Sequence, residues 1–135
     1  MIRILINVLD DEAIWIELIQ RLFTDYENCE VSGYKNSQEF FAHFDKSVDL
    51  VIMDVRLKDG TDVTDRINRI YETSENCYII VVSAYLDIPI LQELMRLRVN
   101  DTVVKADGWL ERLKMAVDRC YPKLKERAFL MAKYK

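Results

Sequence analysis

Continuous apolar runs alternate along the chain with segments whose apolar residues recur every three or four positions. The runs at residues 2–9, 49–53 and 77–84 predict strands that are buried on both faces. Shorter segments at residues 29–34 and 101–104 predict two further strands. Strands that are apolar on both faces are typical of a parallel sheet that helices cover on both sides.

Helical periodicity occupies the segments between and after these strands. In the first of them, Ile14, Leu18 and Leu22 recur at spacings of four, with Ile19 and Phe23 beside them. The predicted helices cover residues 12–26, 38–44, 62–73, 88–97 and 108–121.

Polar residues and prolines mark where several of these helices begin or end. Ser37 and Asp87 are predicted to cap the helices that follow them, and Pro89 suits a first turn. Pro122 is expected either to kink the last helix or to start a further one over residues 123–134.

Five successive β-α units without an internal repeat indicate one α/β domain, a doubly wound parallel sheet in three α/β/α layers. In such sheets the functional site lies at the carboxyl ends of the strands, near the point where the strand order reverses. The residues that follow each predicted strand are therefore the first candidates for chemistry.

Composition narrows the class of protein. The chain has 135 residues, and no apolar run approaches the roughly 18 residues of a membrane span. Cys29, Cys77 and Cys120 are dispersed, so we expect buried reduced thiols and a cytoplasmic location. The single histidine, His43, argues against a multi-histidine metal site or a Ser-His-Asp triad, and we expect it on a helix surface.

Charge is unevenly distributed, although the net charge is only −4. Residues 105–135 contain nine Lys or Arg against four Asp or Glu. Such a segment can contact nucleic acid or an acidic partner, or form a solvated helix face. We favour the solvated face and expect no direct binding of nucleic acid by this domain.

A coherent set of polar residues follows the predicted strands. Asp10 and Asp11 follow the first strand, Asp54 the third, and Ser83 and Lys105 end the fourth and fifth. Clustered carboxylates need a cation, and oxygen ligands without His or Cys favour Mg²⁺. A metal, a lysine and a hydroxyl can together neutralise a phosphoryl group, and one carboxylate can act as its acceptor.

With these residues in place, the chain resembles the receiver domains of two-component response regulators, the CheY-like superfamily. The matching motifs are "ILINVLDDE", "DLVIMDVRLKDG", "IIVVSA" and "DTVVK", over roughly residues 1–121. The resemblance implies a flavodoxin-like fold with strand order 2-1-3-4-5. It also implies an output surface formed by the fourth helix, fifth strand and fifth helix.

The resemblance also implies a role for each matched position. Asp54 would accept a phosphoryl group from a histidine kinase or a phosphotransfer protein. Asp11, with Asp10, would hold Mg²⁺ together with Asp54 and the backbone carbonyl of Arg56.

Two further positions would act on the phosphoryl group itself. Ser83 would bond a phosphoryl oxygen and shift inward as part of the switch, and Lys105 would pair with the phosphoryl group or with Asp54. A homodimer through the output surface or through the C-terminal helix is a further expectation.

Several positions depart from the family pattern. Lys58 and Ala106 stand where many members have proline, and Asp62 where many have glycine. The longer first motif predicts a bulge or extra length in the first strand. A cis peptide bond before Ala106 would be costly, so that loop should differ. Thr102 stands at a common aromatic switch position, which puts the usual switch in doubt.

Two loop residues are predicted to tune the lifetime of an acyl phosphate. Arg56 and Tyr85 lie two positions after Asp54 and Ser83, where bulky side chains could shield the phosphoryl group from water. The alternative is that both simply point to solvent.

Other classes fit the residues less well. A haloacid-dehalogenase-type phosphatase needs a second acid where Arg56 stands, and a flavin binder needs a phosphate-binding loop where the acidic "LDDEA" stands. A pseudo-receiver that acts without phosphorylation is the serious alternative.

The extent of the domain is a last expectation. We expect a receiver domain over residues 1–121, with residues 122–135 forming a linker or a helical extension. An output domain or target could lie beyond this chain.

Overall fold

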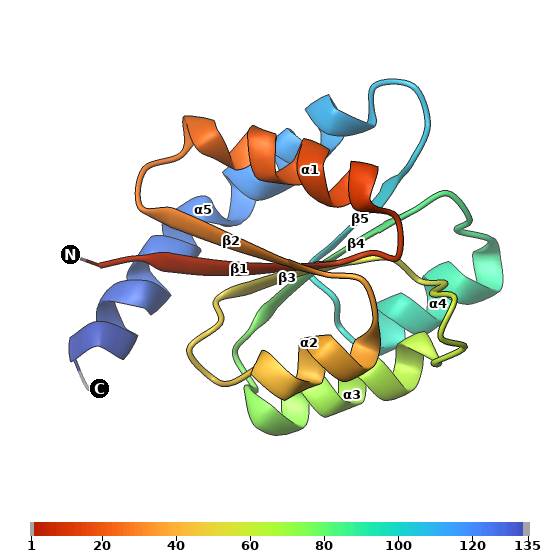
Figure 1. The fold of residues 1–135 in the computed structure, drawn as a ribbon, viewed down its shortest axis with the longest axis horizontal. Helices are drawn as coiled ribbons and strands as arrows, with labels where there is room; N and C mark the ends of the chain where they lie inside the picture. Colours follow the sequence, from red (N-terminus) through yellow and green to blue (C-terminus); the bar gives the residue numbers. More distant parts are fainter. Residues whose placement is uncertain (1, 134–135) are drawn as a thin grey trace.

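The computed structural model describes residues 2–133, which form five parallel strands with helices between them (Figure 1). The strands are β1 (Ile4–Leu9), β2 (Cys29–Tyr34), β3 (Leu50–Met53), β4 (Tyr78–Ser83) and β5 (Asp101–Val104). The helices are α1 (Ala13–Leu22), α2 (Ser37–His43), α3 (Val63–Thr73), α4 (Ile88–Arg96) and α5 (Trp109–Lys133), with a 3-10 turn at Phe23–Asp25. The sheet order, β2-β1-β3-β4-β5, confirms the predicted flavodoxin-like fold.

Helices cover both faces of the sheet, with α1 and α5 on one side and α2, α3 and α4 on the other (Figure 1). Each side has its own apolar core. Ile6, Ile19 and Val117 belong to the first core, and Phe40 and Ile67 belong to the second. The central strands supply residues to both cores, as the continuous apolar runs predicted.

The apolar face of α1 differs from the predicted one. Ile14 is 55% exposed, whereas Ile16 and Ile19 are buried against the sheet. The helix lies close to β2 at Gly33, where a Cβ atom would lie only 2.3 Å from Ile16 Cγ2. The predicted face is therefore confirmed at Ile19 and Phe23 but wrong at Ile14, and it omitted Ile16.

The helix caps were predicted with mixed success. Asp87 caps α4 as expected and accepts a hydrogen bond from the Ile90 N–H at 2.9 Å. The prediction for Ser37 is wrong, because the cap of α2 is Asn36, whose side chain accepts from the Glu39 N–H at 2.8 Å. Ser37 is instead the first residue of the helix.

The longer first motif extends β1 without a bulge. Residue-by-residue pairing with β2 runs unbroken from Ile4 with Cys29 to Leu9 with Tyr34.

The last helix is one continuous element of 25 residues with Pro122 inside it. Residues beyond the proline do not start a separate helix, and Leu124 and Ala128 are buried in the core beneath α1 and α5. Within residues 2–133, no helix combines the length and apolar character that a membrane crossing requires.

Candidate functional site

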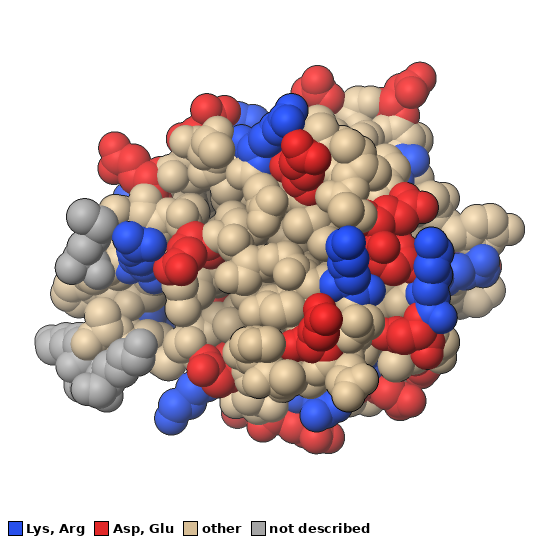
Figure 2. Space-filling model, viewed as in Figure 1, with Lys and Arg blue, Asp and Glu red and all other residues tan. Residues whose placement is uncertain are grey.

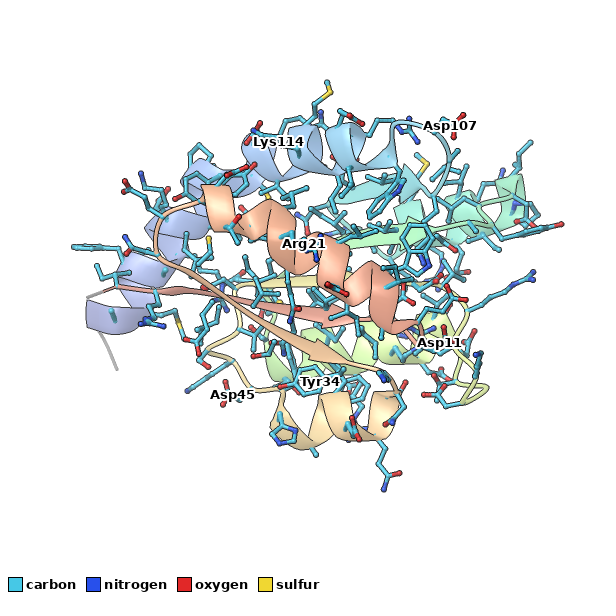
Figure 3. The ribbon with its side chains drawn as sticks, turned by 45° about the horizontal axis from the view of Figure 1, so that its top comes forward. Asp11, Arg21, Tyr34, Asp45, Asp107 and Lys114 are labelled. Carbon is cyan, nitrogen blue, oxygen red and sulfur yellow. The ribbon has the colours of Figure 1, made fainter. Side chains whose placement is uncertain are left out.

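Parallel pairing brings the residues that follow β1, β3 and β5 to the same edge of the sheet. The N–H of Asp54 donates to the Leu9 carbonyl at 3.0 Å, so the acids after β1 and β3 lie side by side. Figure 3 places Asp11 at this carboxyl edge and Asp45 at the other end of the molecule.

Lys105 occupies the centre of the site. Its Nζ lies 2.6 Å from Asp10 Oδ2 and 2.8 Å from Asp54 Oδ2. The side chains of Lys105 and Asp10 are each 4% exposed, and that of Asp54 is 13% exposed. Burial lowers the pKa of Lys105, but its hydrogen bonds to the two carboxylates outweigh this and raise the pKa above its ordinary value. The lysine is therefore held in its charged form.

The oxygens of the acids differ in how firmly they are held. Asp10 Oδ1 accepts from the Glu12 N–H at 2.9 Å, and Asp11 Oδ2 accepts from the Lys58 N–H at 2.8 Å. Asp54 Oδ1 has only a long contact, 3.4 Å, with the Arg56 N–H. Of the Asp54 oxygens, Oδ1 is therefore the one left available for reaction.

The donor chemistry of this edge suits a hard divalent cation. Asp10, Asp11 and Asp54 supply only oxygen ligands, and no sulfur or imidazole lies among them. Within the described part of the chain, no three His, Cys, Asp or Glu side chains are grouped closely enough to enclose a metal, and Lys105 bridges two of the acids. A cation here would share with Lys105 the neutralisation of the carboxylates.

Ser83 is the last residue of β4, and Tyr85 lies in the loop that follows. Ser83 is 2% exposed, and its Oγ accepts from the Tyr85 N–H at 3.3 Å. The Ser83 carbonyl accepts from the Lys105 N–H at 2.9 Å, which ties the ends of β4 and β5 together. The Arg56 guanidinium lies 4.5 Å from the centre of the Tyr85 ring, so the two predicted tuning residues contact each other.

The structure shows where the residues that depart from the receiver pattern lie and what they contact. Thr102 is half-buried in β5 opposite Val81, and Lys58 contributes its main-chain N–H to Asp11. No peptide bond is cis within residues 2–133, as expected for the loop at Ala106.

Several basic residues of the last segment are paired with acids. Ion pairs join Lys114 to Asp118, Arg119 to Asp101 and Arg127 to Asp49. Figure 2 shows both signs of charge interspersed over the visible face rather than gathered in one basic patch.

Two residues near the site escaped sequence reasoning. Arg66 is buried and binds the main chain after β3, although its place beside Val63 and Ile67 on the apolar face of α3 was a usable signal. The centre of the Trp15 ring lies 4.4 Å from Lys105 Nζ. Nothing in the sequence around Trp15 indicated that contact.

The fold and this edge define a receiver domain. The family model for the response regulator receiver domain matches residues 6–117, so the chain belongs to that family. A comparison with curated protein sequences finds no match.

Solved structures of response regulators share the fold. The chain matches DrrB of Thermotoga maritima, an OmpR/PhoB homologue, with a TM-score of 0.78 and 20% identity, covering 91% of this chain and 54% of DrrB. A receiver protein from Pseudomonas putida matches with a TM-score of 0.72 and 27% identity, covering 88% and 98%. Another response regulator from Thermotoga maritima matches with a TM-score of 0.68 and 26% identity, covering 86% and 98%. The chain thus spans about half the length of full DrrB.

Proposed function

We propose that Asp54 accepts a phosphoryl group from a histidine kinase or a phosphotransfer protein, and that this modification switches an output surface. The observation that carries the proposal is the contact of the Lys105 ammonium with both Asp10 and Asp54 at the carboxyl edge. A buried charge held between two acids is suited to a site where negative charge increases during reaction.

In this mechanism Asp54 Oδ1 attacks the phosphorus of a phosphohistidine. The new O–P bond forms as the P–N bond breaks, and the imidazole leaves with the electron pair of that bond. Lys105 keeps its contact with Oδ2 or moves to a phosphoryl oxygen, and Ser83 Oγ donates to another phosphoryl oxygen.

Mg²⁺ would be held by Asp10, Asp11, Asp54 and the carbonyl of Arg56, and when bound it neutralises charge on the phosphoryl oxygens. The acids of the chain contribute by orienting one another. Asp11 fixes the loop after β3 through the Lys58 N–H, and Asp10 fixes Lys105.

We also propose how this domain is bounded, how it associates and where it acts. Residues 1–121 would form the receiver, with residues 122–135 as a helical extension or a linker, and the signal would pass to an output domain or a target protein. Two copies of the chain would form a homodimer, either through α4, β5 and α5 or through the end of α5. The free thiols of Cys29, Cys77 and Cys120 favour a cytoplasmic location.

The test is incubation with Mg²⁺ and acetyl phosphate, followed by intact-mass measurement. We expect the mass gain of one phosphoryl group in the wild type and none in Asp54→Asn. Asp45→Asn, at the opposite end of the molecule, should behave as the wild type does (Figure 3). No gain with acetyl phosphate or with a cognate kinase would favour the pseudo-receiver instead.

A further inference from the structure

Arg66 is a buried arginine on the sheet-facing side of α3. It is only 2% exposed, whereas arginine is seldom fully buried unless it is paired. Its Nη1 donates to the Asp54 carbonyl oxygen at 2.9 Å, and its Nη2 donates to the Val55 carbonyl oxygen. The guanidinium therefore binds the main chain of the phosphoacceptor and of the residue after it.

Stability alone gives little reason for a buried cation at this position. Burial lowers the pKa of Arg66, and the nearby acids Asp59, Asp54 and Asp62 oppose that effect. Apolar side chains of similar volume often replace buried charges without loss of stability. What an apolar side chain cannot do is hold two carbonyl groups in a fixed direction.

The loop after β3 is held at two further points. The Lys58 N–H donates to Asp11 at 2.8 Å. Asp59 accepts from the Ser37 N–H at 2.7 Å and from the Thr61 N–H at 3.0 Å. The N–H of Asp54 is held by the Leu9 carbonyl at 3.0 Å. Arg66 holds the carbonyl groups of Asp54 and Val55, which lie between that contact and the Arg56 carbonyl.

We propose that Arg66 is a positioning residue for phosphorylation, which fixes the main chain at Asp54 and Val55 so that the acceptor carboxylate faces Lys105. The inference rests on the proposed function of Asp54. Phosphoryl transfer depends on aligned reacting atoms, and a loosened acceptor spends less time in that alignment. Arg66 would act through the main-chain carbonyls that it binds and would not contact the phosphoryl group.

The experiment compares three variants of the whole chain. Arg66→Met removes the donors and keeps an apolar side chain of similar length. Arg66→Lys keeps the charge with a single donating group. Arg69→Met is the matched control, because Arg69 lines the same cavity of about 550 Å³ as Arg66 but is exposed, with its guanidinium 4.1 Å from the centre of the Phe41 ring. Circular dichroism first confirms that each variant is folded.

Two readouts separate positioning from a general loss of structure. At saturating Mg²⁺, Arg66→Met should lower the maximal rate of phosphorylation by acetyl phosphate about tenfold, with the half-saturating donor concentration unchanged. Amide hydrogen exchange at Lys58, measured without a donor, should accelerate about tenfold in the same variant. Arg66→Lys should lie between wild type and Arg66→Met, and Arg69→Met should match the wild type.

Wild-type kinetics and wild-type exchange in Arg66→Met would overturn the inference, and so would an equal loss in Arg69→Met. If the wild type itself takes up no phosphoryl group, the proposed function fails. The role in phosphorylation then fails with it, and exchange tests only whether Arg66 holds the main chain after β3: acceleration confined to the Arg66 variants supports that contact, and unchanged exchange overturns it.

Discussion

Strand β3 has an aspartate at each end, and the two differ in how completely they are bonded. Asp49 precedes the strand, with Oδ1 2.6 Å from Arg127 Nη1 and Oδ2 accepting from the Leu5 N–H at 2.8 Å. Asp54 follows it, with Oδ2 bound by Lys105 and Oδ1 only loosely contacted. One acid has both oxygens occupied, and the other keeps one available.

The cations that pair with Asp49 and Asp54 also differ in how many other groups they bind. Arg127 also donates to Ser74 Oγ at 2.9 Å and to the Lys46 carbonyl at 3.0 Å, so it joins α5 to two loops. Lys105 is shared between two acids and makes no comparable links to main-chain carbonyls among the described residues. The ion pair at the amino edge of the sheet is therefore tied to the main chain on both sides, whereas the one at the carboxyl edge leaves an Asp54 oxygen without a close partner.

The largest expected effect is on stability at the amino edge. Arg127→Met would leave the buried Asp49 carboxylate without its partner and should lower the free energy of unfolding by about 3–5 kcal/mol. Arg119→Met is the control, because Arg119 is 59% exposed in its pair with Asp101, and its loss should cost far less. Urea unfolding measures both, and equal losses would remove the distinction between a structural and a surface pair.

At the carboxyl edge the main effect should be on chemistry. Lys105→Met should slow phosphorylation of Asp54 by about 10²- to 10³-fold, because one preorganised charge is lost. Lys114→Met, which removes an exposed lysine paired with Asp118, should leave the rate unchanged. The measurement is the initial rate with acetyl phosphate, and a Lys105→Met rate within a few-fold of wild type would contradict the role of the lysine.

The stability of the loop after β3 should depend on pH through the carboxylate of Asp59. Burial raises the pKa of Asp59, but hydrogen bonds from Ser37 and Thr61 outweigh it and bring the pKa to about 2, below its ordinary value of 3.8. Folding therefore favours the ionised form, and this stabilisation is present above about pH 4 and is lost as the pH falls toward 2.

Because Asp59 is exposed, we expect about 1 kcal/mol between the wild type and Asp59→Asn at about pH 6, shrinking by about pH 3. Urea unfolding at the two pH values measures the difference. A constant difference would mean that the ionised carboxylate is not the stabilising form.

The smallest effect should come from the contacting pair Arg56 and Tyr85. If Arg56 and Tyr85 shield the phosphoryl group together, Arg56→Ala and Tyr85→Ala should each speed its hydrolysis about two- to fivefold, as expected for the loss of one cation–π contact. The double variant should be no faster than either single variant. Unchanged decay of phosphorylated protein in both single variants would show that these side chains do not protect it.

Periodicity predicted the fold well because the central strands are uniformly apolar, which leaves a covered parallel sheet as the arrangement that buries them. Local detail was harder to predict. Asn36 rather than Ser37 caps α2. Both residue types can cap a helix, so the cap depends on which residue begins the helix, and the sequence did not specify that. Ile14 fitted the helical spacing but lies outside the contact that α1 makes with β2.

The central residues of the candidate site were predicted from the sequence, but the residues that support them were not. Strand-end positions indicated that Asp10, Asp54 and Lys105 would meet, and the structure places them in contact. The bonds of Arg127 join residues far apart in the chain, and those of Arg66 reach across a loop to the main chain after β3, so no local pattern specified either set. Arg66 at an apolar helix position was visible, but its partners were not.

The contact between Trp15 and Lys105 has a practical consequence. Trp15 also packs edge-on against Trp109, with ring centres 4.8 Å apart, and these are the only two tryptophans in the sequence. Tryptophan emission of this chain therefore comes from two indoles in contact, one of which packs against Lys105, the partner of Asp54. Emission from the unlabelled protein should report on events at Asp54 as they occur, and Trp109→Phe would isolate the indole nearest the lysine.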